Sequence, residues 1–254
     1  MAQKKHKTSW ESVGSWYDQC VGKDGQHYHQ KIIIPGVLER LRLDGDSSLL
    51  DLACGQGILG RSVSEKITYC GVDVSPSLIQ SAKKLDSSKS HTYYVGDITK
   101  RLPAEKTDFS HAAIILALQN IEDGSLAIAE AGRHLKKGGR FVIVMNHPCY
   151  RIPRQSSWGV DDDKKLQYRR VDRYMSPMAI PITANPGKGS KSDKTWSYHH
   201  PIGTYFSWLQ EGGFVVEALD EWCSDKVSRG GVAKMENRSR KEFPLFLCIT
   251  AIRL

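Results

Sequence analysis

Three glycines and a nearby aspartate form the stretch of this chain best suited to hold a ligand. Gly55, Gly57 and Gly60 follow an apolar run at 49–52 and precede a helical pattern. Glycine lets a backbone approach a ligand closely, and free N–H groups at the start of a helix attract negative charge. Asp51 lies inside the apolar run, just ahead of the first glycine. The stretch predicts a binding loop between a buried strand and a helix.

Two cofactors compete for this loop. The pattern G-x-G-x-x-G, with Asp73 at the end of the next strand, is typical of a nicotinamide dinucleotide site. Asp51 argues for another ligand, because a carboxylate near the loop would repel a pyrophosphate and would suit a cationic amine. S-adenosylmethionine (SAM) carries an ammonium, a carboxylate and a sulfonium, and it has no phosphate. SAM is therefore the favoured interpretation.

Three acids recur at equivalent places in the pattern. Asp51, Asp73 and Asp97 each close one of three successive strands in a βαβαβ arrangement. A lone aspartate at a strand end is often only a helix cap or a turn former. Three in sequence favour a common site instead. An acid at the carboxyl end of the second strand can accept hydrogen bonds from both hydroxyls of a ribose.

The chain resembles a known family over roughly residues 30–147. Asp-Leu-Ala-Cys-Gly-Gln-Gly at 51–57 is similar to the glycine-rich first motif of class I SAM-dependent methyltransferases. Ala53 stands where many members have a glycine, a mild departure because alanine is nearly as small. The resemblance continues through 70–75, 95–98, 109–118 and 135–141. It implies a methyltransferase of the small-molecule type that uses SAM and releases S-adenosylhomocysteine.

The resemblance also implies roles for particular residues. Asp97 would take the adenine amino group while Ile98 packs on the ring. Similar enzymes often use an aromatic N-terminal segment as a lid, so residues 1–30 are expected to cover the cofactor, with Tyr17 near it. The expected cofactor-binding set is Tyr17, Asp51, Ala53, Gly55, Gly57, Asp73, Val74, Asp97, Ile98 and Leu116.

Catalysis of methyl transfer needs little from the protein, because the sulfonium methyl is already activated. The protein has to align the acceptor with the S–CH3 bond and exclude water. A base is needed only when the acceptor atom still holds a proton that it must lose. His147 and His29 are the candidate catalytic residues. Guanidinium groups pair with anions and stack on rings. The candidate substrate-binding residues are Arg151, Arg154, Trp158 and His199.

The elements that must position these residues follow an α/β pattern. Strands are expected near 49–52, 67–74, 92–95, 109–118 and 140–145, with helices from Pro35, from Pro76 and over 125–137. An insert over 150–200, with strand-like segments at 168–174 and 195–199, would act as a substrate cover. A helix from Pro201, strands at 214–219 and 243–252 and a polar stretch at 224–242 complete the chain. We predict one domain over 1–254: a doubly wound, mostly parallel, seven-stranded Rossmann-like sheet with an antiparallel C-terminal hairpin, which the family adds.

Composition bounds the class of protein. The chain has 254 residues, 40% hydrophobic and 25% charged, and no apolar run approaches the roughly 20 residues of a membrane span. We expect a cytoplasmic protein without a membrane partner, as a monomer or homodimer. Six cysteines without metal-ligand spacing predict reduced thiols and no metal. The net charge of +8 permits an anionic partner without establishing one, so nucleic acid is possible but not favoured.

These observations predict a SAM-dependent methyltransferase acting on a small, anionic or aromatic metabolite. A second hypothesis is an RNA or protein methyltransferase that docks through the insert, because residues 150–194 carry ten Lys or Arg against five Asp. A non-catalytic SAM-binding protein and an NAD-dependent oxidoreductase are less favoured hypotheses for the same pattern.

Overall fold

The computed structural model describes residues 22, 25–183 and 194–254. The expectation for Tyr17, and most of the expected lid over 1–30, lie outside the described residues.

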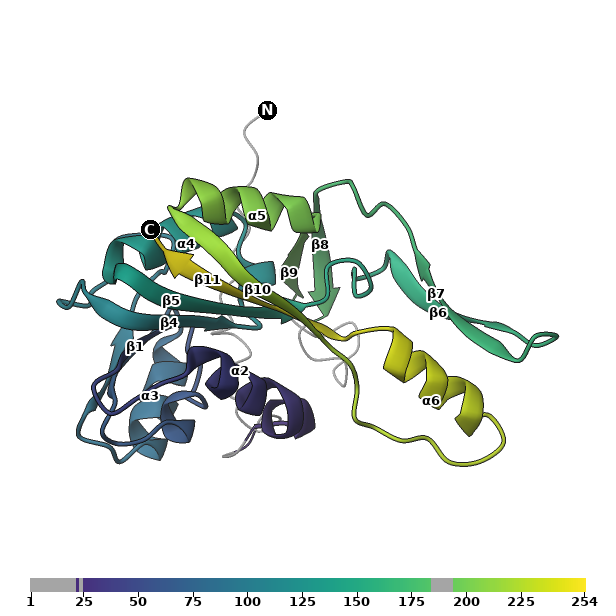
Figure 1. Ribbon diagram of the computed structural model, residues 1–254, viewed down its shortest axis with the longest axis horizontal. Coiled ribbons are helices and arrows are strands. Elements are labelled where there is room, and N and C mark those ends of the chain that lie inside the picture. Colours follow the sequence, from purple (N-terminus) through teal and green to yellow (C-terminus); the bar gives the residue numbers. More distant parts are fainter. Residues whose placement is uncertain (1–21, 23–24, 184–193) are drawn as a thin grey trace.

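A seven-stranded sheet forms the centre of the molecule (Figure 1), in the order β10-β11-β5-β4-β1-β2-β3. The strands β1 to β5 pair in parallel, while β11 runs antiparallel to both β5 and β10. The predicted mostly parallel sheet with an antiparallel C-terminal hairpin is confirmed. The strands of this sheet are β1 (Ser48–Leu52), β2 (Thr68–Asp73), β3 (His91–Val95), β4 (Phe109–Ile115), β5 (Leu135–Asn146), β10 (Phe214–Trp222) and β11 (Phe246–Arg253).

Helices cover both faces of the sheet, so each face has its own hydrophobic core. The apolar sides of α4 and α5 pack on one face, and those of α2 and α3 pack on the other. Strand β5, buried inside the sheet, supplies both cores, with Ile143 pointing into the first and Val142 into the second. The helical elements are η2 (His29–Ile33), α2 (Ile34–Leu41), η3 (Gly60–Ser62), α3 (Pro76–Leu85), η4 (Leu118–Asn120), α4 (Gly124–His134), α5 (Ile202–Glu211) and α6 (Ala233–Glu242).

The structure differs from the sequence-based expectation at three elements. No α-helix follows the glycine loop; the chain makes only the short 3-10 turn η3 there. The helix expected over 125–137 ends at His134, because Leu135 is already extended and residues 136–139 bulge out of β5. The polar stretch 224–242 contains α6, a helix that was not predicted from the sequence.

The insert after β5 consists of two separate hairpins. The expected strands near 168–174 and 195–199 exist as β7 (Leu166–Val171) and β9 (Lys194–His199). Each pairs with a strand that the sequence did not reveal, β6 (Ser156–Asp161) or β8 (Met178–Thr183). The β6–β7 hairpin lies beside α6, whereas β9 lies beside η4 at the end of β4. The insert is therefore not one continuous cover.

Candidate functional site

The glycine loop turns through left-handed backbone conformations directly after β1. The φ angles of Ala53, Gly55 and Gly57 are 58°, 56° and 77°. A side chain at Gly55 would meet nothing within 4 Å, so the backbone at this position faces unfilled space. Because L residues with a side chain rarely adopt such φ values, the loop depends on glycine, and Ala53 holds a strained conformation.

The other glycines of the loop serve a different purpose from the one expected. A Cβ atom at Gly57 or at Gly60 would lie 2.8 Å or 2.4 Å from the hydroxyl oxygen of Tyr93. A Cβ at Gly71, in β2, would lie 2.8 Å from the same ring. These three glycines make room for the Tyr93 side chain in the core. Of the loop glycines, Gly55 is the one whose position fits close approach to a ligand.

Asp51 is buried beneath the loop. Its carboxylate oxygen Oδ2 accepts a hydrogen bond of 2.6 Å from the Tyr69 hydroxyl, and 2% of the residue is exposed. Burial raises the pKa of Asp51 to about 7, with the nearby Asp73 carboxylate adding to the effect and the Tyr69 hydrogen bond opposing it. A carboxyl group in this position would be stabilised in its ionised form by a cation.

Asp73 ties the end of β2 to the loop. Its two carboxylate oxygens accept hydrogen bonds of 2.9 Å from the backbone N–H groups of Gly55 and Ser75. The acid is 7% exposed. These contacts fix the loop against β2 and set the spacing between the first two strand-end acids.

A cavity of about 50 Å³ lies between the loop, η2 and the end of β4. Four predicted site residues line it together: Asp51, Ala53, Gly55 and His29. The sequence reasoning missed the rest of the lining, which is largely apolar: Ile34, Cys54, Gln56, Ile58, Leu59 and Ile115.

His29 lies in this cavity on an unusual element. It begins η2, a π-helix, and π-helical turns are frequent at functional sites. Its ring nitrogen Nδ1 is buried and has no hydrogen-bond partner among the described residues. Burial lowers the pKa of His29, so the ring is neutral at pH 7. Gln56 fixes the preceding chain, because its Nε2 donates to the carbonyl of Gly22 at 2.8 Å.

Asp97 and Ile98, expected to bind adenine, follow β3, and Val74, expected to bind the cofactor, follows β2. Asp97 caps its own turn by accepting from the N–H and hydroxyl of Thr99, and it pairs with Lys100. Burial raises the pKa of Asp97, but these contacts outweigh it and hold the pKa below its usual range. Ile98 is buried in the first core, whereas Val74 is 47% exposed. Of the two apolar residues, Val74 is the one with surface available to a ring.

The end of β4 is shaped by Leu116 and the residues of η4. Leu116 has a φ of 54°, and its N–H donates to the Val144 carbonyl at 2.7 Å. The carbonyl of Leu116 accepts from Gln119 Nε2 and Asn120 Nδ2. The amide oxygen of Gln119 is buried and unpartnered within the described part of the chain. Gln119 thus offers a buried acceptor beside a strained strand end, a feature that sequence reasoning did not single out.

His147, the other catalytic candidate, is fully occupied by the fold. Its Nδ1 accepts from the N–H of Cys149 at 3.2 Å, so its Nε2–H donates to Glu221 Oε1 at 2.7 Å. The residue is 1% exposed, and burial lowers its pKa more than Glu221 raises it. With both nitrogens engaged, this geometry does not support the expectation that His147 acts as a base.

The four candidate substrate-binding residues lie in the insert and do not line the cavity. Arg151 donates to Asn146 Oδ1 at 2.6 Å and lies over the Phe246 ring. Trp158 packs against Phe243 and Arg169, and His199 Nε2 donates to the Tyr174 carbonyl at 2.7 Å. Arg154 is exposed in the turn before β6. None of the four is among the residues that line the cavity.

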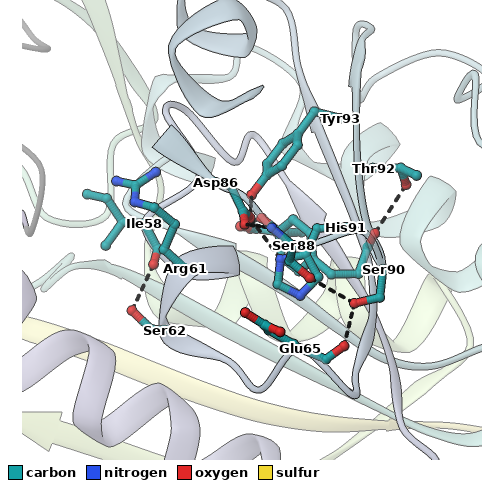
Figure 2. A network of polar contacts seen from close by, with 12 residues as sticks. Ile58, Arg61, Ser62, Glu65, Asp86, Ser88, Ser90, His91, Thr92 and Tyr93 are labelled. Atoms are coloured by element: carbon teal, nitrogen blue, oxygen red, sulfur yellow. Dashed lines mark hydrogen bonds and ion pairs between the residues drawn. The ribbon is translucent and has the colours of Figure 1, made fainter. Parts of the chain in front are cut away.

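A larger cavity of about 440 Å³ lies between η3, the end of α3 and the start of β3. Figure 2 shows its polar network, in which Asp86 accepts from both His91 Nδ1 and the Tyr93 hydroxyl. Its lining contains none of the three strand-end acids and no other candidate site residue. We therefore place the candidate site at the smaller cavity, where the chemically distinctive groups converge.

Two further classes of feature are absent from the described part of the chain. No three His, Cys, Asp or Glu side chains there gather closely enough to hold a metal ion. The helices of that part are all too short or too polar to cross a membrane.

Comparison with known proteins identifies what the chain is similar to. Residues 50–143 match a family described as a methyltransferase domain. A SAM-dependent methyltransferase from Mesorhizobium loti, solved as a crystal structure, superposes with a TM-score of 0.71 at 25% identity, over 91% of this chain and 100% of that one.

Curated relatives match over a shorter span. A 37.1 kDa transposon protein of Streptomyces fradiae is 30% identical over 192 residues, which are 67% of this chain and 54% of that protein. A demethylmenaquinone methyltransferase of Staphylococcus haemolyticus is 25% identical over 141 residues, 54% of this chain and 59% of that enzyme. The chain thus spans about half the length of the curated relatives it matches.

Proposed function

Because this chain belongs to the class I family of SAM-dependent methyltransferases, we propose that it transfers a methyl group from SAM to a small aromatic acceptor. The observation that carries the proposal is the cavity at the carboxyl edge of the sheet, where Asp51, Gly55 and His29 meet. Ligands bind at this edge in doubly wound folds.

We assign the cofactor contacts as follows. Asp51 receives the ammonium of SAM, because a buried carboxyl with a raised pKa gains from a nearby cation. Asp73 accepts from the ribose hydroxyls, Asp97 accepts from the adenine amino group, and Val74 packs on the ring. The cavity has room for the end of a ligand, so the adenosine lies along the sheet edge beyond it.

The loop itself favours SAM over a dinucleotide. A pyrophosphate site would need free N–H groups at the start of a helix, and no α-helix starts in this loop. Asp51 and Asp73 would also repel the phosphates. The two acids, by contrast, favour a ligand whose end is cationic.

His29 is the proposed general base. When bound, SAM supplies the activated methyl group, and the protein has only to align the acceptor and remove its proton where it has one. A neutral imidazole whose Nδ1 lacks a partner can take that proton. Gln119 could fix the acceptor through its amide oxygen, which lies at the end of β4.

An aromatic acceptor is favoured over an anionic one. The guanidinium of Arg151, expected to bind an anion, is engaged by Asn146 and Phe246. Half of the residues that line the cavity are aliphatic: Ile34, Ala53, Ile58, Leu59 and Ile115. Relatives named demethylmenaquinone methyltransferases are consistent with a small-molecule acceptor. The β8–β9 hairpin, beside η4, is the part of the insert in the right place to cover it.

Two measurements test this proposal. Calorimetric titration should show binding of SAM and S-adenosylhomocysteine and no binding of NAD. Methyl transfer from labelled SAM into a cell extract, separated into metabolite, RNA and protein fractions, should label the metabolites. Label in RNA or protein would overturn the acceptor class, and SAM binding without any transfer would indicate a non-catalytic protein.

A further inference from the structure

Much of the positive charge of this protein is concentrated on one projecting part. We define the arm as residues 150–175 and 224–242, which hold the β6–β7 hairpin and α6. Figure 1 shows both elements extending from the same side of the sheet. The arm carries thirteen Lys or Arg against seven Asp or Glu, a net +6 in a chain of net +8.

Exposed apolar side chains are concentrated on the same arm. Of the thirteen large hydrophobic residues that are exposed in the described part of the chain, the arm holds seven. They are Trp158, Val160, Tyr168, Val171, Met175, Val227 and Val232. Cationic and exposed apolar groups together mark a surface that meets an anionic and partly apolar partner.

Within the arm, α6 carries a cationic stripe. Lys234, Arg238 and Lys241 lie at i, i+4 and i+7, so they share one face of the helix, and all three are exposed. None of them forms an ion pair with another residue in the described ranges.

The rest of α6 is used to hold the helix in place. Its buried residue, Ser239, donates to the Gln167 carbonyl of β7. On another side, Asn237 Nδ2 donates to the Ser228 carbonyl at 3.0 Å and Ser228 N–H donates to Asn237 Oδ1 at 2.7 Å. A helix with almost no apolar face is thus tied to β7 and to the preceding loop, which leaves the stripe in solvent.

We propose that this stripe and the loop before it dock the protein on the surface of an anionic phospholipid bilayer. The three cations lie against the lipid phosphates, and Val227 and Val232, which are 76% and 55% exposed, enter the interface. The tip of the β6–β7 hairpin is left out of this surface, because the three acids at 161–163 outnumber the two cations Lys164 and Lys165 there.

The exposed aliphatic residues distinguish lipid from nucleic acid. Nucleic-acid surfaces that accept single strands combine cations with aromatic rings on which bases stack. Along the α6 stripe and its loop the exposed apolar residues are valines, which gain from hydrocarbon and offer no stacking surface. A bilayer satisfies both the charge and the valines.

The location of the surface connects it to the candidate site, although the docking does not depend on the proposed function. The segment that contains α6 joins the end of β10 to the start of β11, next to the end of β5. This is the edge at which the cavity lies. Docking would bring the site close to the bilayer, so a lipid-soluble aromatic acceptor could enter without crossing bulk water.

The test measures co-sedimentation of the full chain with vesicles, without SAM or acceptor. Binding to phosphatidylcholine vesicles that contain phosphatidylglycerol should greatly exceed binding to phosphatidylcholine alone and should weaken with salt. The triple variant Lys234→Gln, Arg238→Gln, Lys241→Gln should lose about 100-fold in partition coefficient. Val227→Ser with Val232→Ser should weaken binding at high salt, where the charge attraction is screened.

A charge-matched control separates this surface from net charge. Lys83→Gln, Lys84→Gln, Lys89→Gln removes three exposed cations on and after α3, away from the arm, and should bind vesicles almost as the unaltered protein does. Equal losses in the two triple variants would overturn the docking surface. So would tight binding of single-stranded RNA, weakened by the α6 variant, together with no binding to the anionic vesicles.

Discussion

Ala53 occupies a backbone conformation that alanine disfavours, with a φ of 58°. The left-handed region costs an L residue about 1–2 kcal/mol, and glycine is free of that cost but loses about 0.4–1 kcal/mol through the unfolded state. Ala53→Gly should therefore raise the free energy of unfolding by about 0.5–1 kcal/mol. Chemical denaturation measures this free energy. Gly57→Ala should lower it, because the added Cβ would clash with Tyr93. A destabilised Ala53→Gly protein would show that the strain is relieved elsewhere.

The raised pKa of Asp51 makes cofactor binding depend on pH. The folded protein holds this proton up to a pH of about 7, whereas the unfolded chain loses it near 3.8. Its contribution to stability is therefore present at low pH and falls as the pH rises from about 4 to about 7. A bound ammonium reverses the balance by favouring the carboxylate.

SAM affinity should accordingly rise between pH 5 and about 7 and then level off, with release of a proton on binding. Asp51→Asn should weaken binding at pH 8 by about 1.5–3 kcal/mol and remove this part of the pH dependence. Calorimetry in buffers of different ionisation enthalpy measures both effects. A variant with the original pH profile would place the titrating group elsewhere.

Replacing His29 and replacing His147 should have different effects on the kinetics of methyl transfer. For an acceptor that carries a proton, His29→Gln should lower kcat by about 10²–10⁴-fold with SAM affinity nearly unchanged. In the unaltered enzyme at saturating SAM, kcat should rise through an apparent pKa below 6.5, because burial lowers the pKa of His29. His147→Gln should instead lower stability and leave this pH profile in place, since both His147 nitrogens bond within the fold. A shifted profile in His147→Gln would contradict that assignment.

At this scale the sequence predicted residue types better than their contacts. The acids Asp51 and Asp73 stand out because each lies within or at the end of a strand-like segment, and that local signal is strong. The purpose of Gly57 and Gly60 could not be predicted, because it depends on Tyr93, which is distant in sequence. His147 looked available from its position after β5, yet its partner Glu221 comes from β10.

At the scale of elements, α6 is held by few contacts and should be the least stable helix. Ser228→Ala removes the hydroxyl that donates to Glu236 and accepts from Arg240, while the backbone hydrogen bonds of Ser228 can still form. Amide exchange in α6 should become faster, with the exchange of β5 unchanged. Ser207→Ala, a serine exposed on α5 whose hydroxyl bonds only within its own helix, is the matched control. Faster exchange throughout the sheet would show that α6 is part of the core.

Periodicity predicted the parallel strands well, because β1, β2 and β4 are short apolar runs buried on both faces. It failed where long-range pairing overrides local pattern. Residues 135–139 look like a helix end, yet pairing with Phe109 draws Leu135 into β5. The expected helix after the glycine loop is missing, and α6 has no apolar stripe by which to recognise it.

The whole molecule should unfold in one step. The two cores share β5, whose successive residues point alternately into each, so neither can be lost without the other. Scanning calorimetry should give one transition whose calorimetric and van't Hoff enthalpies agree. The same transition should be reported by Trp fluorescence and by far-ultraviolet circular dichroism. Two resolved transitions would mean that the insert, or the N-terminal residues, unfolds as a separate domain.

The Tyr93 ring, enclosed by Gly57, Gly60 and Gly71, links positions that belong to three different segments of the chain. In an alignment of relatives these four positions should therefore vary together. Where a small residue replaces the tyrosine, its constraint on the three glycines is lost, and the constraints that remain are Tyr69 beside Gly60, Cys54 Sγ beside Gly71 and the φ of 77° at Gly57. The spacing of glycines in this loop would then record the size of a neighbour in β3 as much as the identity of the ligand.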